Sequence, residues 1–242
     1  MRTKNHWLFP FIMMFMHIGS NAQEIKSALS LSKTYFVNKV EDESFDYDKD
    51  PDNLWSLANI LSDFSYPWRE ENSNLTLFRA LHDNRFFYFR YDVVDPKIYT
   101  DKKTGNETDV MNSDRVEIFF LANKKMNPYY CLEMDAEGNL FDYLAKYYRQ
   151  NNFEWNWPTD NIELKAFKKR NGYGISGKIN LEYLRKIQAL QADSMYLGLF
   201  RADINEYEDG KPVFKWISWI EPNAEEPDFH IPSAFGRFVM SQ

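Results

Sequence analysis

The chain has 242 residues, of which 29 are Lys or Arg and 36 are Asp or Glu, and 17% are aromatic. A formal net charge of −7 argues against a nucleic-acid-binding protein, which needs a surplus of basic side chains to neutralise phosphates. The single cysteine excludes an internal disulfide framework and any zinc or iron–sulfur cluster held by cysteines.

The N-terminal segment has the order of a secretory signal peptide. Residues 1–4 contain two basic side chains, residues 7–18 are apolar and lack Asp, Glu, Lys and Arg, and residues 19–22 end the segment with small side chains. This order predicts cleavage near Ala22 and export to the periplasm or the extracellular space. The apolar stretch is too short for a transmembrane helix, which needs about 20 residues, so we expect no membrane span. A mitochondrial presequence and a buried N-terminal helix are the alternatives.

Acidic side chains crowd between residues 41 and 52. Asp48, Asp50 and Asp52 alternate, and this spacing lets carboxylate oxygens converge on a hard cation such as calcium. The segment is not an EF-hand, because Asn53 and Asn59 stand where that loop needs Gly and Glu. We therefore expect either a structural calcium site or a solvated acidic loop.

Short runs rich in β-branched and aromatic residues, bounded by turn residues, follow along most of the remaining chain. They predict strands over residues 75–81, 85–94, 114–121, 129–134, 139–145, 162–167, 173–179, 195–204, 213–220 and 235–240. The turn sequences at residues 135–138, 171–172 and 208–211 are typical of hairpins. Strands joined by tight hairpins are antiparallel neighbours, so the pattern predicts an all-β fold, an antiparallel β-sandwich of jelly-roll type.

One helix is predicted over residues 181–190. Leu181, Leu184, Ile187 and Leu190 recur at three-residue spacing, and Asn180 precedes them in the position of an N-cap. No linker or internal repeat interrupts the chain, so residues 23–242 are expected to form a single domain with this one short helix.

Motifs for nucleophilic or metal-dependent catalysis are absent from the sequence: it has no G-x-S-x-G, no H-E-x-x-H and no phosphate-binding glycine-rich loop. Glu133 and Asp135 are one candidate carboxylate pair for a glycoside hydrolase acting on plant polysaccharide, although any polar strand face gives the same spacing. Met111, His82 and His230 are candidate axial ligands for a haem- or redox-carrying sandwich domain. Both functions remain alternatives.

The surplus of aromatic residues is the strongest remaining signal. Trp155 and Trp157 stand in one aromatic segment, and Trp216 and Trp219 lie on a late predicted strand. Indole rings stack on the apolar faces of sugars, but most Trp and Tyr side chains of a sandwich pack in its core or at its rim. A subset exposed on one concave face would indicate a carbohydrate-binding site.

Several segments, taken in order, resemble the family 9 carbohydrate-binding modules. Asp114-Arg115-Val116-Glu117-Ile118-Phe119-Phe120 is similar to the D-x-V-E strand of that family, and residues 87–96, ending in Asp95-Pro96, are similar to the strand before it. Ile217-Ser218-Trp219 and residues 232–236 are similar to the end of the family's domain. The resemblance covers about residues 75–240.

This resemblance implies a β-sandwich that binds an oligo- or polysaccharide without cleaving it, alongside a partner glycoside hydrolase such as a xylanase, and that contains structural calcium. We expect a monomer.

The two Trp positions that hold a sugar ring in the family are Met111 and Phe229 here, and His230 follows the second of them. Glu117 keeps the family's carboxylate, whereas Glu133 stands near a position that is Arg in the family. The predicted carbohydrate-binding residues are Met111, Glu117, Glu133, Trp219, Phe229 and His230, and the predicted calcium ligands are Asp48, Asp50 and Asp52.

Overall fold

Strands dominate the computed structural model, which describes residues 33–41, 54–71 and 73–242. Its strands are β1 (Thr34–Lys39), β2 (Thr76–His82), β3 (Phe86–Val94), β4 (Arg115–Leu121), β5 (Tyr129–Asp135), β6 (Leu140–Lys146), β7 (Gln150–Asn152), β8 (Ile162–Lys169), β9 (Gly172–Asn180), β10 (Ser194–Glu208), β11 (Lys211–Ser218) and β12 (Gly236–Met240). Its helices are α2 (Leu181–Lys186) and the short 3-10 helices η1 (Leu54–Leu57), η2 (Glu107–Asn112), η3 (Thr159–Asn161) and η4 (Pro232–Ala234).

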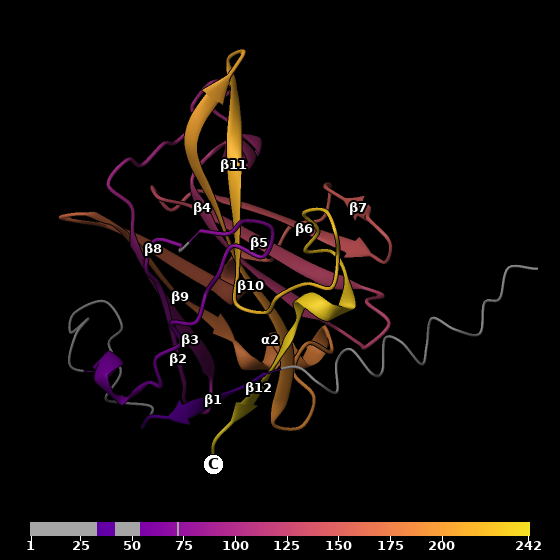
Figure 1. Cartoon of the computed structure of the whole chain (residues 1–242). Coiled ribbons are helices and arrows are strands. Elements are labelled where there is room, and N and C mark those ends of the chain that lie inside the picture. The colour runs from indigo at the N-terminus through magenta and orange to yellow at the C-terminus, as the bar shows by residue number, and fades with distance from the viewer. Residues whose placement is uncertain (1–32, 42–53, 72) are drawn as a thin grey trace, which may run out of the picture.

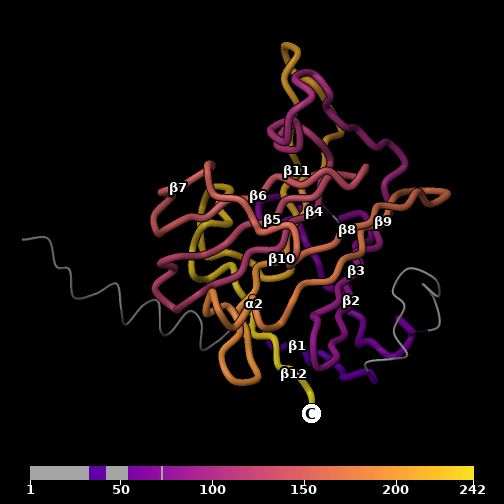
Figure 2. Tube along the Cα trace, turned by 180° about the vertical axis from the view of Figure 1, so that it is seen from behind, coloured from indigo at the N-terminus to yellow at the C-terminus, as the bar shows by residue number. Residues whose placement is uncertain are grey.

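The strands form one curled sheet in the order β7-β6-β5-β4-β10-β12-β1-β2-β3-β9-β8, and β11 pairs with β10 beside this path. The two halves of the curled sheet form the layers of a sandwich, joined through β1 (Figure 1). β1 pairs in parallel with both β12 and β2, whereas the other pairs of these strands are antiparallel. The predicted all-β sandwich is confirmed. Figure 2 shows the β10–β11 ribbon at one end of the molecule and the C-terminus at the other.

Local sequence signals account for the hairpins and the helix. Asn171 and Gly172 lie at the predicted turn between β8 and β9, and Gly172 has a φ of 152°. A Cβ at Gly172 would lie 1.9 Å from the carbonyl oxygen of Val93, so only glycine fits there. The Oδ1 of Asn180 accepts a hydrogen bond of 3.1 Å from the Tyr183 amide, as expected of an N-cap. The helix is shorter than predicted, because α2 ends at Lys186.

The main core fills the space between the two layers. Alternate side chains of β3 and β4 point into it, among them Phe87, Phe89 and Val116. None of the helices within residues 33–41, 54–71 and 73–242 has the length and apolar composition needed to cross a membrane.

A second apolar cluster lies on the opposite, outer face of β4, β5, β6 and β10. Phe119, Tyr129, Tyr143 and Phe200 belong to it, and residues 223–235, between β11 and β12, cover part of it with Phe229. The sheet thus has a covered rather than a solvated outer face here. The candidate functional site lies between this covering segment and the strands.

Candidate functional site

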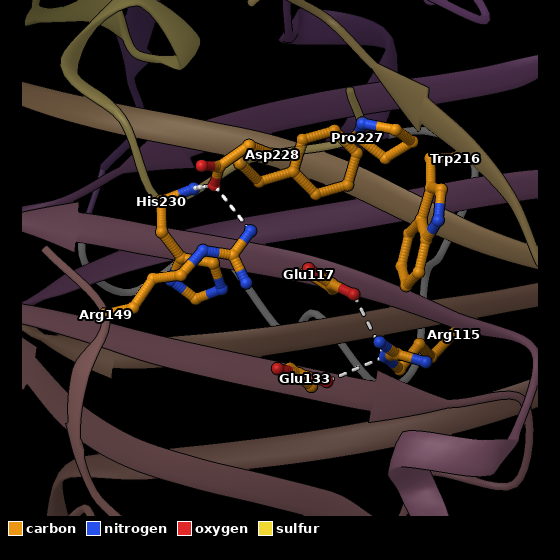
Figure 3. Close-up of a pocket in the computed structure, with 9 residues that line it drawn as sticks. Arg115, Glu117, Glu133, Arg149, Trp216, Pro227, Asp228 and His230 are labelled. Atoms are coloured by element: carbon orange, nitrogen blue, oxygen red, sulfur yellow. Dashed lines mark hydrogen bonds and ion pairs between the residues drawn. The ribbon is translucent and has the colours of Figure 1, made fainter. Parts of the chain in front are cut away.

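A cavity of about 150 Å³ lies on the outer face of β4 and β5, against the segment between β11 and β12 (Figure 3). Its lining combines charged, aromatic and imidazole side chains from five separate parts of the chain: Arg115, Glu117, Glu133, Arg149, Trp216, Pro227, Asp228, Phe229 and His230. Small-ligand sites are usually concave and combine apolar or aromatic walls with some placed polar groups; this cavity has the aromatic wall, but most of its lining residues are charged or polar.

A buried ionic triad forms the floor of the cavity. Arg115 and Glu117 are two residues apart on β4 and so face the same side, and Glu133 on β5 lies opposite Glu117 in the strand register. The Nε of Arg115 lies 2.9 Å from Glu117 Oε1 and 2.7 Å from Glu133 Oε2. Tyr143 donates a hydrogen bond of 3.0 Å to the other oxygen of Glu133, and Arg115 Nη1 donates one of 3.0 Å to the carbonyl oxygen of Met111.

The triad has one positive charge for two carboxyl groups. Burial and the neighbouring carboxylate of Glu133 raise the pKa of Glu117, although the Arg115 guanidinium opposes this rise. The single Nε–H of Arg115 cannot point at both carboxylates, and Arg115 Nε, Glu117 Oε1 and Glu133 Oε2 are buried without a well-directed hydrogen bond. Each of these three atoms already has an oppositely charged partner at 2.7 or 2.9 Å, so the capacity left for a polar ligand is that of Glu117 Oε2 and Arg115 Nη2, which have no partner among the described residues.

Aromatic rings form one wall of the cavity. The ring centroids of Trp216 and Phe229 are 5.7 Å apart, at 87° to each other, and the Arg115 guanidinium lies 5.5 Å from the Trp216 ring. Phe229 stacks on Phe200 at 4.1 Å and is backed by Trp68 at 5.6 Å. Phe229 is therefore held rigidly from behind, and Trp216 is the more exposed of the two wall residues.

A polar network ties the loop after β6 to the covering segment at the cavity rim. Arg149 Nη2 lies 2.9 Å from Asp228 Oδ1, and Tyr148 donates a hydrogen bond of 2.7 Å to Asp228 Oδ2. The backbone amide of His230 donates to Asp228 Oδ1 at 2.8 Å. One carboxylate thus connects two segments that are far apart in sequence.

His230 closes the other side of the cavity as a neutral imidazole. Its Nδ1 lies 2.9 Å from the hydroxyl of Tyr129, which is buried beneath it on β5. Burial and the nearby Arg149 lower the pKa of His230 to about 4, although Asp228 opposes this effect. The ring is therefore uncharged at neutral pH.

The depressed pKa of His230 predicts that stability falls on acidification. The unfolded chain binds a proton at His230 near pH 6.5, whereas the folded protein binds one only near pH 4. Stability is therefore unaffected above pH 7 and decreases between about pH 6.5 and 4, by a total of about 3 kcal/mol from this group. Urea denaturation at pH 7, 5.5 and 4 measures the effect. The His230→Gln variant should show a shallower pH dependence, and an unchanged one would contradict the assignment.

Four of the predicted carbohydrate-binding residues share this cavity: Glu117, Glu133, Phe229 and His230. Met111 lies in η2 with 38% of its side chain exposed and contributes its carbonyl oxygen to Arg115, but it does not line the cavity. Trp219 lies in the main core, 3% exposed and against Phe238. Their roles in binding stay predictions.

The residues proposed for haem ligation do not converge. His82 lines a different cavity, near the C-terminal strand, and its ring nitrogens contact the carbonyl oxygens of Asp83 and Ser241. His230 lines the cavity over β4 and β5, and Met111 lines neither. The structure thus offers these three side chains no common site.

The predicted calcium ligands Asp48, Asp50 and Asp52 lie outside the described residues, so calcium binding there stays a prediction. The residues that the structure describes contain one carboxylate cluster close enough to share a metal ion, made of Asp95, Asp114 and Asp203. Arg201 Nη2 lies 3.0 Å from Asp95 and 2.6 Å from Asp203, so a guanidinium already pairs with two of the three carboxylates. The cluster is a buried ion-pair network and does not fit an open calcium site.

Five of the lining residues are outside the predicted carbohydrate-binding set: Arg115, Arg149, Trp216, Pro227 and Asp228. Arg115 lies in the D-x-V-E segment two residues before Glu117. Because side chains alternate between the two faces of a strand, Arg115 and Glu117 lie on the same face. Trp216 was one of the aromatic candidates. Arg149 and Asp228 lie on loops that only the tertiary structure brings together.

Comparisons with known proteins agree with this architecture. The sequence matches the family model "Carbohydrate family 9 binding domain-like" over residues 48–242. A protein of Bacteroides uniformis ATCC 8492, to which carbohydrate binding has been ascribed, has a similar structure at 16% identity, covering 87% of this chain and 100% of that chain with a TM-score of 0.62. A family 9 carbohydrate-binding module from Caldicellulosiruptor kristjanssonii, solved with cellotriose, is also similar at 16% identity, covering 86% of this chain and 93% of that chain with a TM-score of 0.54. At these identities the structures share the fold. No curated protein matches the chain.

Proposed function

This chain belongs to the carbohydrate family 9 binding domain-like family, and from that premise we propose that it binds a carbohydrate chain, without cleaving it, in the cavity over Arg115, Glu117 and Glu133. One observation carries the proposal. Glu117 Oε2 and Arg115 Nη2, which have no partner among the described residues, belong to side chains that line the cavity beside an aromatic wall. A sugar ring presents hydroxyl groups at its edge and apolar C–H groups on its face, so it matches both.

Each part of the cavity has a role toward such a ligand. Glu117 and Glu133 accept hydrogen bonds from sugar hydroxyls, and Arg115 donates to a hydroxyl oxygen; charge-assisted bonds of this kind are stronger than neutral ones. The Trp216 ring stacks on the C–H face of the sugar. Because the site is small and its rim is open to solvent, we expect a Kd between about 1 µM and 1 mM, or about −8 to −4 kcal/mol.

The Glu133–Asp135 pair considered for a hydrolase is not arranged as a catalytic pair. The Asp135 carboxylate accepts hydrogen bonds from the amides of Glu137 and Asn139, each at 2.9 Å, and so stabilises the turn after β5. Asp135 does not line the cavity that Glu133 lines. The pair therefore does not flank a common substrate position, as an acid and a nucleophile or base must.

The biological setting follows from the same premise. The ligand of the Caldicellulosiruptor kristjanssonii module supports cello-oligosaccharides as first probes. We propose an exported monomer that supports polysaccharide breakdown beside a partner glycoside hydrolase, with the signal peptide cleaved near Ala22. These parts of the proposal rest on the sequence and on the family.

Isothermal titration calorimetry with cello- and xylo-oligosaccharides tests the proposed function. We expect saturable binding, and we expect Trp216→Ala to weaken it about tenfold, because loss of a stacked ring costs about 1.5 kcal/mol. The matched control is Phe36→Ala, which removes a ring that is 55% exposed on β1, away from the cavity. Reducing-sugar release from the same samples tests the hydrolase alternative. Absence of binding to a panel of neutral and acidic glycans would refute the proposal.

A further inference from the structure

We infer that a second carbohydrate subsite lies beside the cavity on the exposed ring of Phe153, so that the protein binds at least two consecutive units of a glycan chain. The inference rests on the proposed function of the cavity and adds to it the length and the direction of the ligand.

Strand register leads from the cavity floor to this ring. Glu117 on β4 lies opposite Glu133 on β5, and Glu133 lies opposite Phe141 on β6. The three side chains thus form one row across the outer face of the sheet, and neighbouring strands are about 4.8 Å apart. Phe153 follows β7, the edge strand that pairs with β6, and its ring contacts Phe141. A glycan unit over Glu133, which also lines the cavity, lies one strand spacing from Phe141, so its next unit along the row reaches the Phe153 ring.

Phe153 has the properties of a rigid binding platform. Half of the side chain, 50%, is exposed. From behind, its ring contacts Phe141 at 5.6 Å and Tyr143 at 5.1 Å between centroids, and both of these residues are buried in the second apolar cluster. A ring held in this way loses little conformational entropy when a ligand stacks on its free face.

The platform is connected to the charged floor through Tyr143. The same Tyr143 side chain that supports the Phe153 ring donates the hydrogen bond of 3.0 Å to Glu133 Oε1. The platform and the floor are therefore built on one pair of neighbouring strands, β5 and β6, and cannot shift independently.

The surroundings of Phe153 suit a sugar better than a protein partner. Single exposed apolar residues are common on protein surfaces, and a protein interface needs a contiguous apolar patch. The neighbouring side chains of β7, which are Gln150, Asn151 and Asn152, are exposed amides. One aromatic face beside exposed amides and the exposed Glu154 carboxylate matches the C–H face and the hydroxyl groups of a sugar unit.

Dependence of affinity on chain length tests the inference. The probes are glucose, cellobiose and cellotriose, with xylose, xylobiose and xylotriose as a second series. We expect the wild-type protein to bind the disaccharide about tenfold more tightly than the monosaccharide, as an added stacking contact provides. Phe153→Ala should abolish most of this gain and leave the monosaccharide affinity unchanged. Phe36→Ala, the matched loss of an exposed ring, should change neither value.

The outcomes separate this inference from the proposed function. If wild-type protein binds the disaccharide no better than the monosaccharide, or if Phe153→Ala keeps the full gain, the second subsite is refuted and the proposed function stands. If wild-type protein binds no member of either series, both are refuted. Phe153→Leu keeps apolar bulk over Phe141 without a flat ring, and it should also lose the gain. Urea midpoints of the variants report any loss of folding.

Discussion

Replacing Arg201 by methionine is expected to lower the free energy of unfolding by about 3–5 kcal/mol, the largest stability effect that we predict for this protein. Arg201 is 0% exposed and pairs with Asp95 and Asp203. Asp114 is buried beside them, and its burial raises its pKa to about 7. Removal of the guanidinium leaves Asp95 and Asp203 buried without their cation, next to the buried Asp114, whereas methionine retains most of the side-chain volume.

Urea denaturation at pH 7 measures this loss, and Arg79→Met is the matched control. Arg79 Nη1 lies 2.7 Å from Asp92, but Asp92 also pairs with Arg90 and Lys169, so its charge stays compensated. The control should cost no more than about 1 kcal/mol. Carboxylates left unpaired by Arg201→Met bind protons more tightly in the folded state than in the unfolded state. The loss in free energy of unfolding should therefore become smaller as the pH falls. Equal losses in the two variants would contradict the prediction.

Glu117→Gln is expected to weaken disaccharide binding about 2- to 10-fold, because burial and Glu133 raise the pKa of Glu117 to about 8 and a hydrogen bond to the neutral carboxyl group contributes about 0.5–1.5 kcal/mol. The fold should not be destabilised. Glutamine removes the carboxyl group whose pKa is raised by burial and by Glu133, and it leaves Arg115 paired with Glu133 alone. One guanidinium then faces one carboxylate, so the buried charges balance.

Titration calorimetry and urea denaturation of the same variant test both halves of this prediction. Glu163→Gln is the control, since that carboxylate pairs with Lys178 between β8 and β9, away from the cavity. It should leave disaccharide affinity unchanged. Unchanged affinity in Glu117→Gln would remove Glu117 from the site. A large loss of stability in that variant would show that the ionised carboxylate is needed for folding instead.

Local pattern predicted most of the strands but not the topology. Ten predicted runs correspond to strands β2 to β6 and β8 to β12, and the hairpin turns lie where their residues placed them. β1 and the three-residue β7 were missed. β1 pairs in parallel with β12, about two hundred residues away in the sequence, and with β2, and no turn motif indicates parallel pairing.

The cavity was predictable to the same limited degree. The D-x-V-E segment identified Glu117, and the same periodicity places Arg115 beside it on one face of β4. Glu133 was identified by resemblance, but its shared contact with Arg115 depends on the register of β4 with β5. The Arg149–Asp228 contact joins two loops, and nothing in either local sequence indicates the other.

Trp216 and Trp219 show most clearly what the sequence determined and what it left open. Their odd spacing in an extended segment places the two rings on opposite faces of the strand, and this follows from the sequence alone. The tertiary structure decides which of the two rings lines the cavity. Trp216 lies opposite Ala202 where β11 pairs with β10, whereas Trp219 packs against Phe238 in the main core. Alternation is a local property of the backbone, whereas the identity of the buried face depends on strands distant in sequence. The sequence therefore determined that the two rings lie on opposite faces, and only the tertiary structure determined which of these faces is buried in the core.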